Sequence, residues 1–434
     1  MRRRLGPLET FYAAAHAEGM LLDVNVVHVE PALEPRLLSQ ALALAQARHP
    51  LLRAQLVEED RVVSFAERPD APTVPLTTIA WGGEEHLDQQ IEDVFSSGFD
   101  SATEPLWKVI LVRDSARDRC VMLLALHHAA VDGTACMTII DEILTACGQL
   151  EVGTSPDVSP LPLPPAVEQL LPPGGRFSRP RVFVKKVLRR IHKPPNALLP
   201  FDRPAPPRER RTRLLCRSLG RDATATLRRA CHGEGGTVHG ALCAATMLTA
   251  YEMLRPIEEN PMVVCASSIS LRQLCHPGVD GQVGCFASRL KSGFRMDDSV
   301  SFWLLARQIS QDLSRRRERR EPAERLLWRA DQKPGSHDAA RRAIRDTLAE
   351  DHNHGRSCAV AISNRGAFDL PDTYGRYRIT GIYSAAGEHL LGPNVASNFV
   401  TFHDQLFHTL AYFTPLMSSE TAERFSDRVL SLLS

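Results

Sequence analysis

The fold of this chain is decided by one stretch, Leu123-Leu124-Ala125-Leu126-His127-His128-Ala129-Ala130-Val131-Asp132-Gly133. Cys120 to Leu126 is an unbroken apolar run of strand length, and charged residues precede it as a turn. From Met137 to Cys147 apolar residues recur at helical spacing, with Asp132 or Thr134 available as the N-cap. The sequence therefore predicts a buried strand that ends at two histidines, a small-residue turn and an amphipathic helix.

The two histidines, the aspartate and the glycine form the pattern His127-His128-x-x-x-Asp132-Gly133. Four defined residues at fixed spacing would occur by chance in about one in a thousand chains of this length. The pattern resembles the HHxxxDG signature of a superfamily that groups CoA-dependent acyltransferases, polyketide-associated acyltransferases, alcohol acetyltransferases and nonribosomal peptide condensation domains.

Two further segments are similar to the polyketide-associated members: the opening Leu5-Gly6-Pro7-Leu8-Glu9, and Ser363-Asn364-x-Gly366 at the end of a predicted strand. The DFGWG motif of the plant BAHD branch is absent, which disfavours that branch. The resemblance implies two chloramphenicol-acetyltransferase-like halves in a V, with a central tunnel and the HHxxxDG loop near its middle.

The residues alone predict a mixed α/β (α+β) fold, because consecutive strands separated by short charged turns pair antiparallel. No GxGxxG follows a strand and no GxxxxGK[ST] is present, which disfavours nucleotide-dependent kinases and Rossmann dehydrogenases. In the second half, strands are expected at Met262 to Ile269 and at Gln282 to Leu290. Antiparallel strands are expected there too.

The chain of 434 residues is long enough for two domains, and prolines concentrate between positions 153 and 207. We therefore expect an N-terminal half carrying the motif at 1–152, a proline-rich basic linker at 153–211 and a C-terminal half at 212–434. Positions 176–213 hold thirteen lysines and arginines against two acidic residues. This segment is either a solvated surface or a docking surface for an acidic carrier protein or the phosphates of coenzyme A.

The resemblance implies a role for each residue of the motif. His128 is the candidate catalytic base, which takes the acceptor's proton and returns a proton to the departing thiolate without an acyl-enzyme. His127 is expected to pack, and Asp132 is expected to form an ion pair with Arg272. Gly133 permits the turn and the close approach of substrate.

Ser363 and Asn364 are expected along the substrate tunnel. Taken singly, each residue of the motif also fits a structural role, since polar groups at a strand end and an Asp-Gly before a helix are ordinary features. His352 and His354 are close in sequence, yet no further ligand cluster lies near them, and we expect no metal.

The composition indicates a cytoplasmic protein. Its ten cysteines form no CxxC pair and fall in apolar segments, as expected of small buried residues in a reducing compartment. The basic N-terminus lacks the apolar segment of a secretory signal, and no apolar run approaches the length of a membrane span. The arginine-rich segment 315–320 lacks interleaved aromatic residues, so nucleic-acid binding is not expected.

Three hypotheses of function remain open. The first is a free-standing acyltransferase that moves an acyl group from an acyl-CoA or phosphopantetheinyl carrier-protein thioester to a hydroxyl of a lipid or polyketide-like acceptor, with no permanently bound cofactor. The second is a condensing enzyme that forms an amide with an amine acceptor. The third is a catalytically inactive binding module, against which the intact motif argues.

Overall fold

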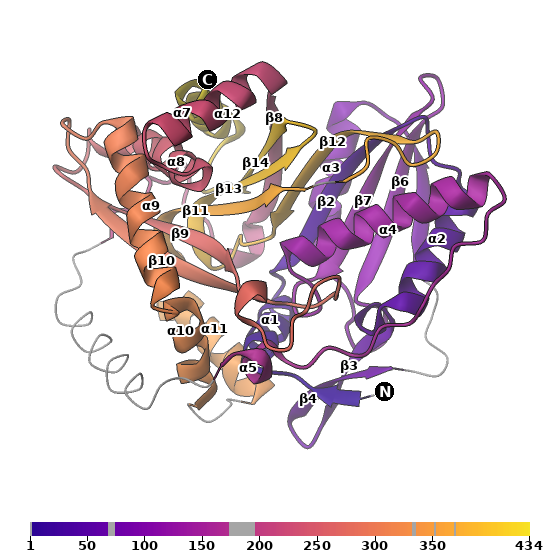
Figure 1. Cartoon of the computed structure of the whole chain (residues 1–434). Coiled ribbons are helices and arrows are strands. Elements are labelled where there is room, and N and C mark those ends of the chain that lie inside the picture. Colours follow the sequence, from indigo (N-terminus) through magenta and orange to yellow (C-terminus); the bar gives the residue numbers. More distant parts are fainter. Residues whose placement is uncertain (1, 68–73, 173–195, 332–335, 351–352, 369) are drawn as a thin grey trace.

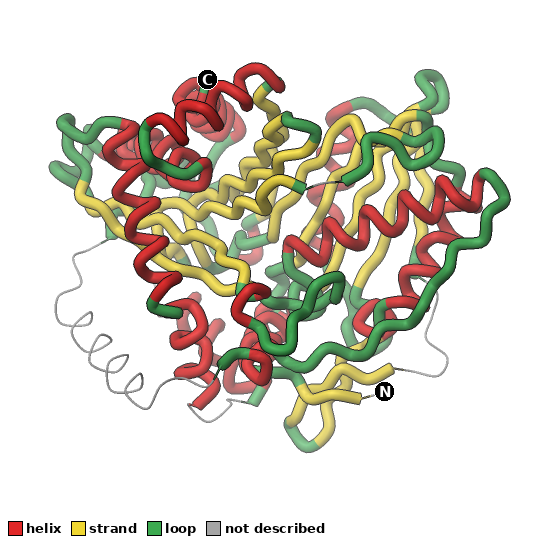
Figure 2. Tube along the Cα trace, viewed as in Figure 1, coloured by secondary structure: helices red, strands yellow, loops and turns green. Residues whose placement is uncertain are grey.

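The computed structural model describes residues 2–67, 74–172, 196–331, 336–350, 353–368 and 370–434. Two halves lie side by side, each built from a sheet and the helices that cover it (Figure 1). Figure 2 shows the strands gathered inside and most helices on the outside of both halves. The predicted mixed α/β fold is confirmed.

The first half contains a five-stranded sheet in the order β12-β2-β7-β6-β5. Its bounds are β12 (Arg378–Ala386), β2 (Leu22–Glu30), β7 (Arg119–His127), β6 (Trp107–Asp114) and β5 (Leu76–Ala80). A small sheet, β1-β4-β3, lies beside it, with β1 at Arg2–Arg4, β4 at Val62–Glu67 and β3 at Ala54–Glu59.

The second half contains a six-stranded sheet in the order β10-β9-β11-β13-β14-β8. Its bounds are β10 (Ala287–Arg295), β9 (Met262–Ser270), β11 (Arg356–Ala367), β13 (Gly392–Phe402), β14 (Gln405–Thr414) and β8 (Arg211–Leu219). The strand β11 pairs parallel with both β9 and β13, and β5 pairs parallel with β6. The consecutive strands joined by short charged turns, β3 with β4 and β6 with β7, do pair antiparallel, as predicted. The parallel neighbours are joined by longer connections.

The helices of the first half are α1 (Pro7–Ala17), α2 (Pro35–Arg48), α3 (Glu84–Ser97) and α4 (Gly133–Glu151), and the short α5 (Val167–Leu170) follows. Those of the second half are α7 (Arg221–Gly233), α8 (Val238–Leu254), α9 (Phe302–Glu318), α10 (Glu321–Asp331), α11 (His337–Glu350) and α12 (Ser419–Leu433). Short 3₁₀ turns occupy Pro50–Arg53, Pro207–Glu209 and Arg272–Leu274.

The motif strand β7 is buried on both faces, which explains its continuous apolar run. Met122, Leu124 and Leu126 belong to the core shared with α2 and α4. Leu123 and Ala125 point to the opposite face, where they share a core with α3 and with residues of the second half's sheet. The strand that ends at His127, just before His128, is thus held between the helices and the second half.

The strand β12 lies far along the chain yet pairs with β2 of the first half, from Arg378 opposite Glu30 to Ala386 opposite Asp23. Figure 1 shows this yellow strand beside the indigo β2. The expected C-terminal segment, 212–434, therefore does not fold entirely within its own half. This pairing covers the edge of β2, whose backbone groups would otherwise lack a partner strand.

The second strand of the C-terminal half was misplaced by the sequence pattern. It was expected at Gln282 to Leu290, but β10 spans Ala287–Arg295. The apolar residues just before it belong to the loop 271–286, where Cys285 and Phe286 join a small core with α5 and α10. A short apolar run does not by itself distinguish a strand from a buried loop.

All ten cysteines are free thiols, and nine of them are buried. Within the described ranges, no helix is both long enough and apolar enough to span a membrane.

Candidate active site

The two motif histidines lie at the end of β7, where the chain turns sharply into α4. The Ala130 N–H donates to the His127 carbonyl over 2.9 Å, which closes the turn. Asp132 is the N-cap of α4, and its Oδ1 accepts a hydrogen bond of 2.8 Å from the Ala135 N–H. Because a buried strand and a capped helix hold both ends, the turn presents His128 in one orientation.

His128 is half-buried and oriented by two contacts. Its Nδ1 lies 2.8 Å from the Val131 carbonyl oxygen, which only accepts, so Nδ1 carries the proton and donates it. In the neutral imidazole the other ring nitrogen, Nε2, therefore carries the lone pair. The ring of Tyr12, from α1, stacks on the imidazole with centroids 4.4 Å apart and planes 5° apart. This tautomer is the one that a general base requires.

The His127 side chain is fully buried, unlike that of His128. Its Nδ1 accepts a hydrogen bond of 3.0 Å from the Ala129 N–H, and its ring lies 4.2 Å from that of His16. Burial, together with the neighbouring His16 and His128, lowers the pKa of His127 well below its ordinary value. The neutral, enclosed ring agrees with the packing role expected from the sequence.

Asp132 contacts the partner that the sequence analysis named. Its Oδ1 accepts a hydrogen bond of 2.9 Å from Arg272 Nη2, and its Oδ2 accepts one of 3.0 Å from the Phe286 N–H. Arg272 also donates to the carbonyls of Val279 and Gln282 and lies over the Phe286 ring. Asp132 thus fastens both ends of the loop 271–286 to the start of α4.

A second buried ion pair joins the halves on the other side of the motif. Arg365, from β11, donates to both carboxylate oxygens of Asp23 on β2 over 2.9 and 3.0 Å. Its Nη1 donates to Asn25 Oδ1 and to the Gly133 carbonyl. A Cβ on Gly133 would lie 3.0 Å from Arg365 Nε, so this motif glycine leaves room for the guanidinium.

His128 lines a cavity of about 70 Å³, the inner cavity, whose lining residues come from both halves. Gly133 lines it from the first half, and Ser268, Ser288 and Ser363 line it from the second. Ser363 thus lines the same cavity as the candidate base. Asn364 does not line this cavity, and its Oδ1 instead accepts a hydrogen bond from the Gly366 N–H.

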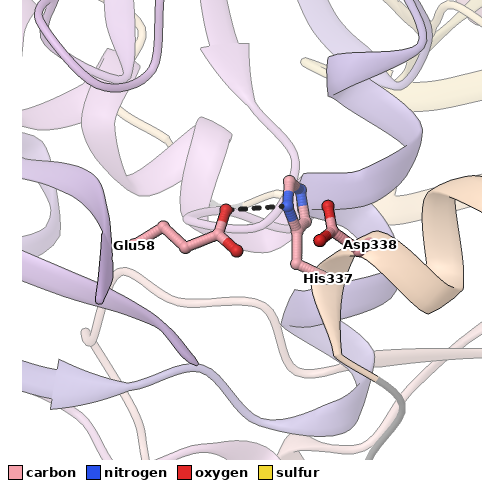
Figure 3. Close-up of side chains that lie close together, drawn as sticks. All are labelled: Glu58, His337 and Asp338. Carbon is pink, nitrogen blue, oxygen red and sulfur yellow. Dashed lines mark ion pairs between the residues drawn. The ribbon is translucent and has the colours of Figure 1, made fainter. Parts of the chain in front are cut away.

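In the described part of the chain, one group of side chains offers three possible metal ligands: Glu58 on β3, and His337 and Asp338 at the start of α11 (Figure 3). His337 Nδ1 lies 3.5 Å from Glu58 Oε2, an ion pair that joins β3 to α11. None of the three lines the inner cavity. His352 lies outside the described residues, and the His354 carbonyl accepts a hydrogen bond from Arg210.

Several residues that line the inner cavity were not predicted from the sequence: Tyr12, Asp23, Arg289, Arg365 and Glu388. They come from α1, β2, β10, β11 and the turn after β12, which only the fold brings together. Arg365 offered the single local signal, since it occupies the variable position of Ser363-Asn364-x-Gly366. The others belong to no motif.

The family model that matches this chain is described as "Condensation domain" and covers residues 21–339. The chain is also similar to curated peptide synthetases. A probable, noncanonical nonribosomal peptide synthetase, CymA of Salinispora arenicola (strain CNS-205), is 30% identical over 231 residues, or 50% of this chain. A linear gramicidin synthase of Brevibacillus parabrevis is 30% identical over 149 residues, or 33% of this chain. Each match spans only 3% of the relative's own length.

Two solved structures share the fold over almost the whole chain. TRI3 trichothecene 15-O-acetyltransferase from Fusarium sporotrichioides superposes with a TM-score of 0.76 at 11% identity, covering 100% of this chain and 94% of that one. Polyketide synthase associated protein 5 from Mycobacterium tuberculosis gives 0.70 at 15% identity, covering 99% and 97%. These likenesses confirm the paired acetyltransferase-like halves as the architecture.

Proposed function

The chain belongs to the Condensation domain family, and we propose that it transfers an acyl group from a thioester to a hydroxyl acceptor, with His128 as general base. The observation that carries this proposal is the fixed tautomer of His128, whose Nδ1 donates to the Val131 carbonyl and whose Nε2 is left able to accept a proton. Nε2 lies on a ring that lines a cavity between the two halves.

The proposed reaction uses that geometry. Nε2 takes the proton of the acceptor hydroxyl as its oxygen attacks the thioester carbonyl carbon. The tetrahedral intermediate then collapses, the carbon–sulfur bond breaks, and the imidazolium returns the proton to the thiolate. A positioned base contributes about 10²–10⁴-fold to the rate, and holding both substrates in a closed site adds to it. No acyl-enzyme is needed.

The donor is proposed to be acyl-CoA or a phosphopantetheinyl carrier protein, either of which brings an activated thioester. The basic segment 176–213 is proposed to attract their negative charges. Its residues 176–195 lie outside the described residues. Within the described part, Arg210 is buried and Arg213 pairs with Glu92, so these two arginines are already engaged. Docking through this segment predicts a donor KM that rises with ionic strength.

Amide formation is the second candidate, because both curated relatives reported above are peptide synthetases. An amine acceptor would use the same base, since Nε2 can take a proton from nitrogen as from oxygen. The two reactions therefore differ in the acceptor rather than in the site described above.

Mass spectrometry of the products tests both candidates. Wild-type protein is incubated with acyl-CoA and phosphopantetheinyl carrier-protein thioesters of increasing chain length, each with an alcohol and with an amine acceptor, and His128→Ala serves as the matched control. We expect ester product from wild type and a loss of about 10²–10⁴-fold in the variant, with an unchanged circular dichroism spectrum. Amide product alone would favour the second candidate. No product from either protein, or equal product from both, would contradict a catalytic role and leave the binding module.

A further inference from the structure

The inner cavity adjoins a larger cavity that His128 does not line. This outer cavity has a volume of about 320 Å³. The two cavities share four lining residues, Tyr12, Ser288, Arg289 and Glu388, and so meet at one wall. A volume of about 320 Å³ falls within the range of ligand pockets, whereas about 70 Å³ has room for only a few atoms.

One side of the outer cavity is apolar. Its apolar lining comes from α1 and the turn after it, from α10 and from the segment before β13: Leu8, Phe11, Met20, Leu21, Leu326 and Leu391. Phe11 is 43% exposed, which is unusual for a phenylalanine of the described chain. An exposed ring in a concave apolar surface is expected where an apolar ligand covers it.

An ion pair forms the wall between the cavities. Arg289, on β10, donates through Nη2 to Glu388 Oε1 and through Nη1 to Glu388 Oε2, the latter over 3.1 Å. The Glu388 side chain is only 4% exposed, whereas that of Arg289 is 41% exposed because it borders both cavities. Glu388 raises the pKa of Arg289, so the guanidinium stays charged.

The fold makes room for this pair. A Cβ on Gly392 would lie 2.5 Å from Glu388 Oε2, and Gly392 has a φ of +134° that other residues rarely adopt. The pair spans the two halves, because β10 belongs to the six-stranded sheet and Glu388 follows β12 of the five-stranded sheet.

We propose that the outer cavity binds the apolar acyl chain of the donor thioester and that the Arg289–Glu388 pair weakens the binding of long chains relative to short ones. This inference rests on the proposed acyl transfer. A short acyl group reaches His128 within the inner cavity and leaves the pair intact. A long chain extends past Tyr12 into the outer cavity, and it must displace the guanidinium from the carboxylate, which costs binding free energy because the carboxylate is buried.

Chain-length profiles test the proposal. In Arg289→Met/Glu388→Gln both charges are removed and side-chain length is nearly kept, so neither partner is left as an unpaired charge. We expect the ratio of kcat/KM for decanoyl-CoA to that for acetyl-CoA to rise at least about 10-fold over wild type, which corresponds to about 1.4 kcal/mol. An unchanged ratio would overturn the proposal.

A second variant narrows the outer cavity without touching the pair. Leu326→Trp should lower the rate with decanoyl-CoA about 10-fold or more and spare acetyl-CoA, because the indole occupies the space of the chain. Leu304→Trp, at a 39% exposed position of α9, is the matched control and should change neither rate. If Leu326→Trp instead alters the preference for the length of the acceptor, the cavity binds the acceptor and the proposal is wrong.

A binding measurement separates this proposal from the proposed function. Decanoyl-CoA should raise the Tm of His128→Ala protein and fail to raise that of His128→Ala/Leu326→Trp. If this pattern appears while wild type transfers no acyl group, the cavity assignment stands and acyl transfer falls. If wild type transfers acyl groups but both variants are stabilised equally, the cavity assignment falls alone.

Discussion

At the scale of single residues, the rings that surround the two motif histidines are uncharged. Burial raises the pKa of the Tyr12 hydroxyl, so its ring stacks on His128 as a neutral group. Burial likewise lowers the pKa of His16 to about 4, which keeps the ring behind His127 uncharged. Among the three histidines of this cluster, His128 is the one that lines the inner cavity.

We expect Asp132 to stabilise the fold rather than to take part in the reaction, and its replacement tests this. Asp132→Asn places an amide where the carboxylate accepts from Ala135, Arg272 and Phe286, so at least one of these donors loses its acceptor. Breaking one side of a buried ion pair costs about 3–5 kcal/mol. We expect urea denaturation to show a loss of that order, with reduced activity. Full loss of activity at unchanged stability would assign Asp132 to the chemistry instead.

The sequence predicted those site residues that lie in or beside a motif. His128, Asp132 and Gly133 are close together in the chain, and Arg272 follows a predicted strand, so their proximity could be inferred from the resemblance. Arg289 and Glu388 lie 99 positions apart in the sequence and meet only because β10 and the turn after β12 face each other. No local pattern carries that contact.

At the scale of elements, most helices and strands follow from hydrophobic period, but the loop 271–286 does not. Its apolar residues predicted part of a strand, whereas they pack as a loop that Asp132 holds at both ends. The strand register could be recovered only with the partner strand, since Ala287 pairs with Ser270 and Arg295 with Met262.

The attachment of β11 to the first half depends on Arg365. Arg365→Met removes the donors to Asp23, Asn25 and Gly133 and leaves the Asp23 carboxylate buried without its cation. We expect a loss of about 3–5 kcal/mol in the free energy of unfolding, measured by urea denaturation. The double variant Asp23→Asn/Arg365→Met should recover part of this loss, because the unpaired charge is gone. Additive losses in the double variant would show that the pair does not couple the elements.

At the scale of the whole molecule, the two halves are joined by more than the linker. The pairing of β12 with β2 and the ion pairs of Asp132, Asp23 and Glu388 all connect the two halves around the inner cavity. The segment boundaries expected from the prolines could not reveal this. Composition indicates a linker between two halves, but it does not indicate that a later strand, β12, pairs with a strand of the first half. The site therefore belongs to the interface rather than to either half.

Acid should destabilise the folded molecule as a whole, because several histidines are buried in neutral form. Burial lowers the pKa of His16, His28 and His389 to about 4 and that of His408 to about 3. In the unfolded chain each has a pKa near 6.5, so between pH 6.5 and about 4 the unfolded state binds more protons than the folded state. The free energy of unfolding must then fall as the pH falls through this window.

His28, a half-buried residue of β2, gives a direct test of that dependence, because desolvation is the largest cause of its lowered pKa and it lies outside the inner cavity. From the shift, this residue accounts for about 2 kcal/mol of the loss between pH 7.5 and 5. Urea denaturation across that range should show a shallower pH dependence for His28→Gln, whereas His232→Gln, at an exposed position of α7, should retain the wild-type slope. Equal slopes for His28→Gln and wild type would mean that the His28 ring is protonated in the folded state over the same range as in the unfolded one.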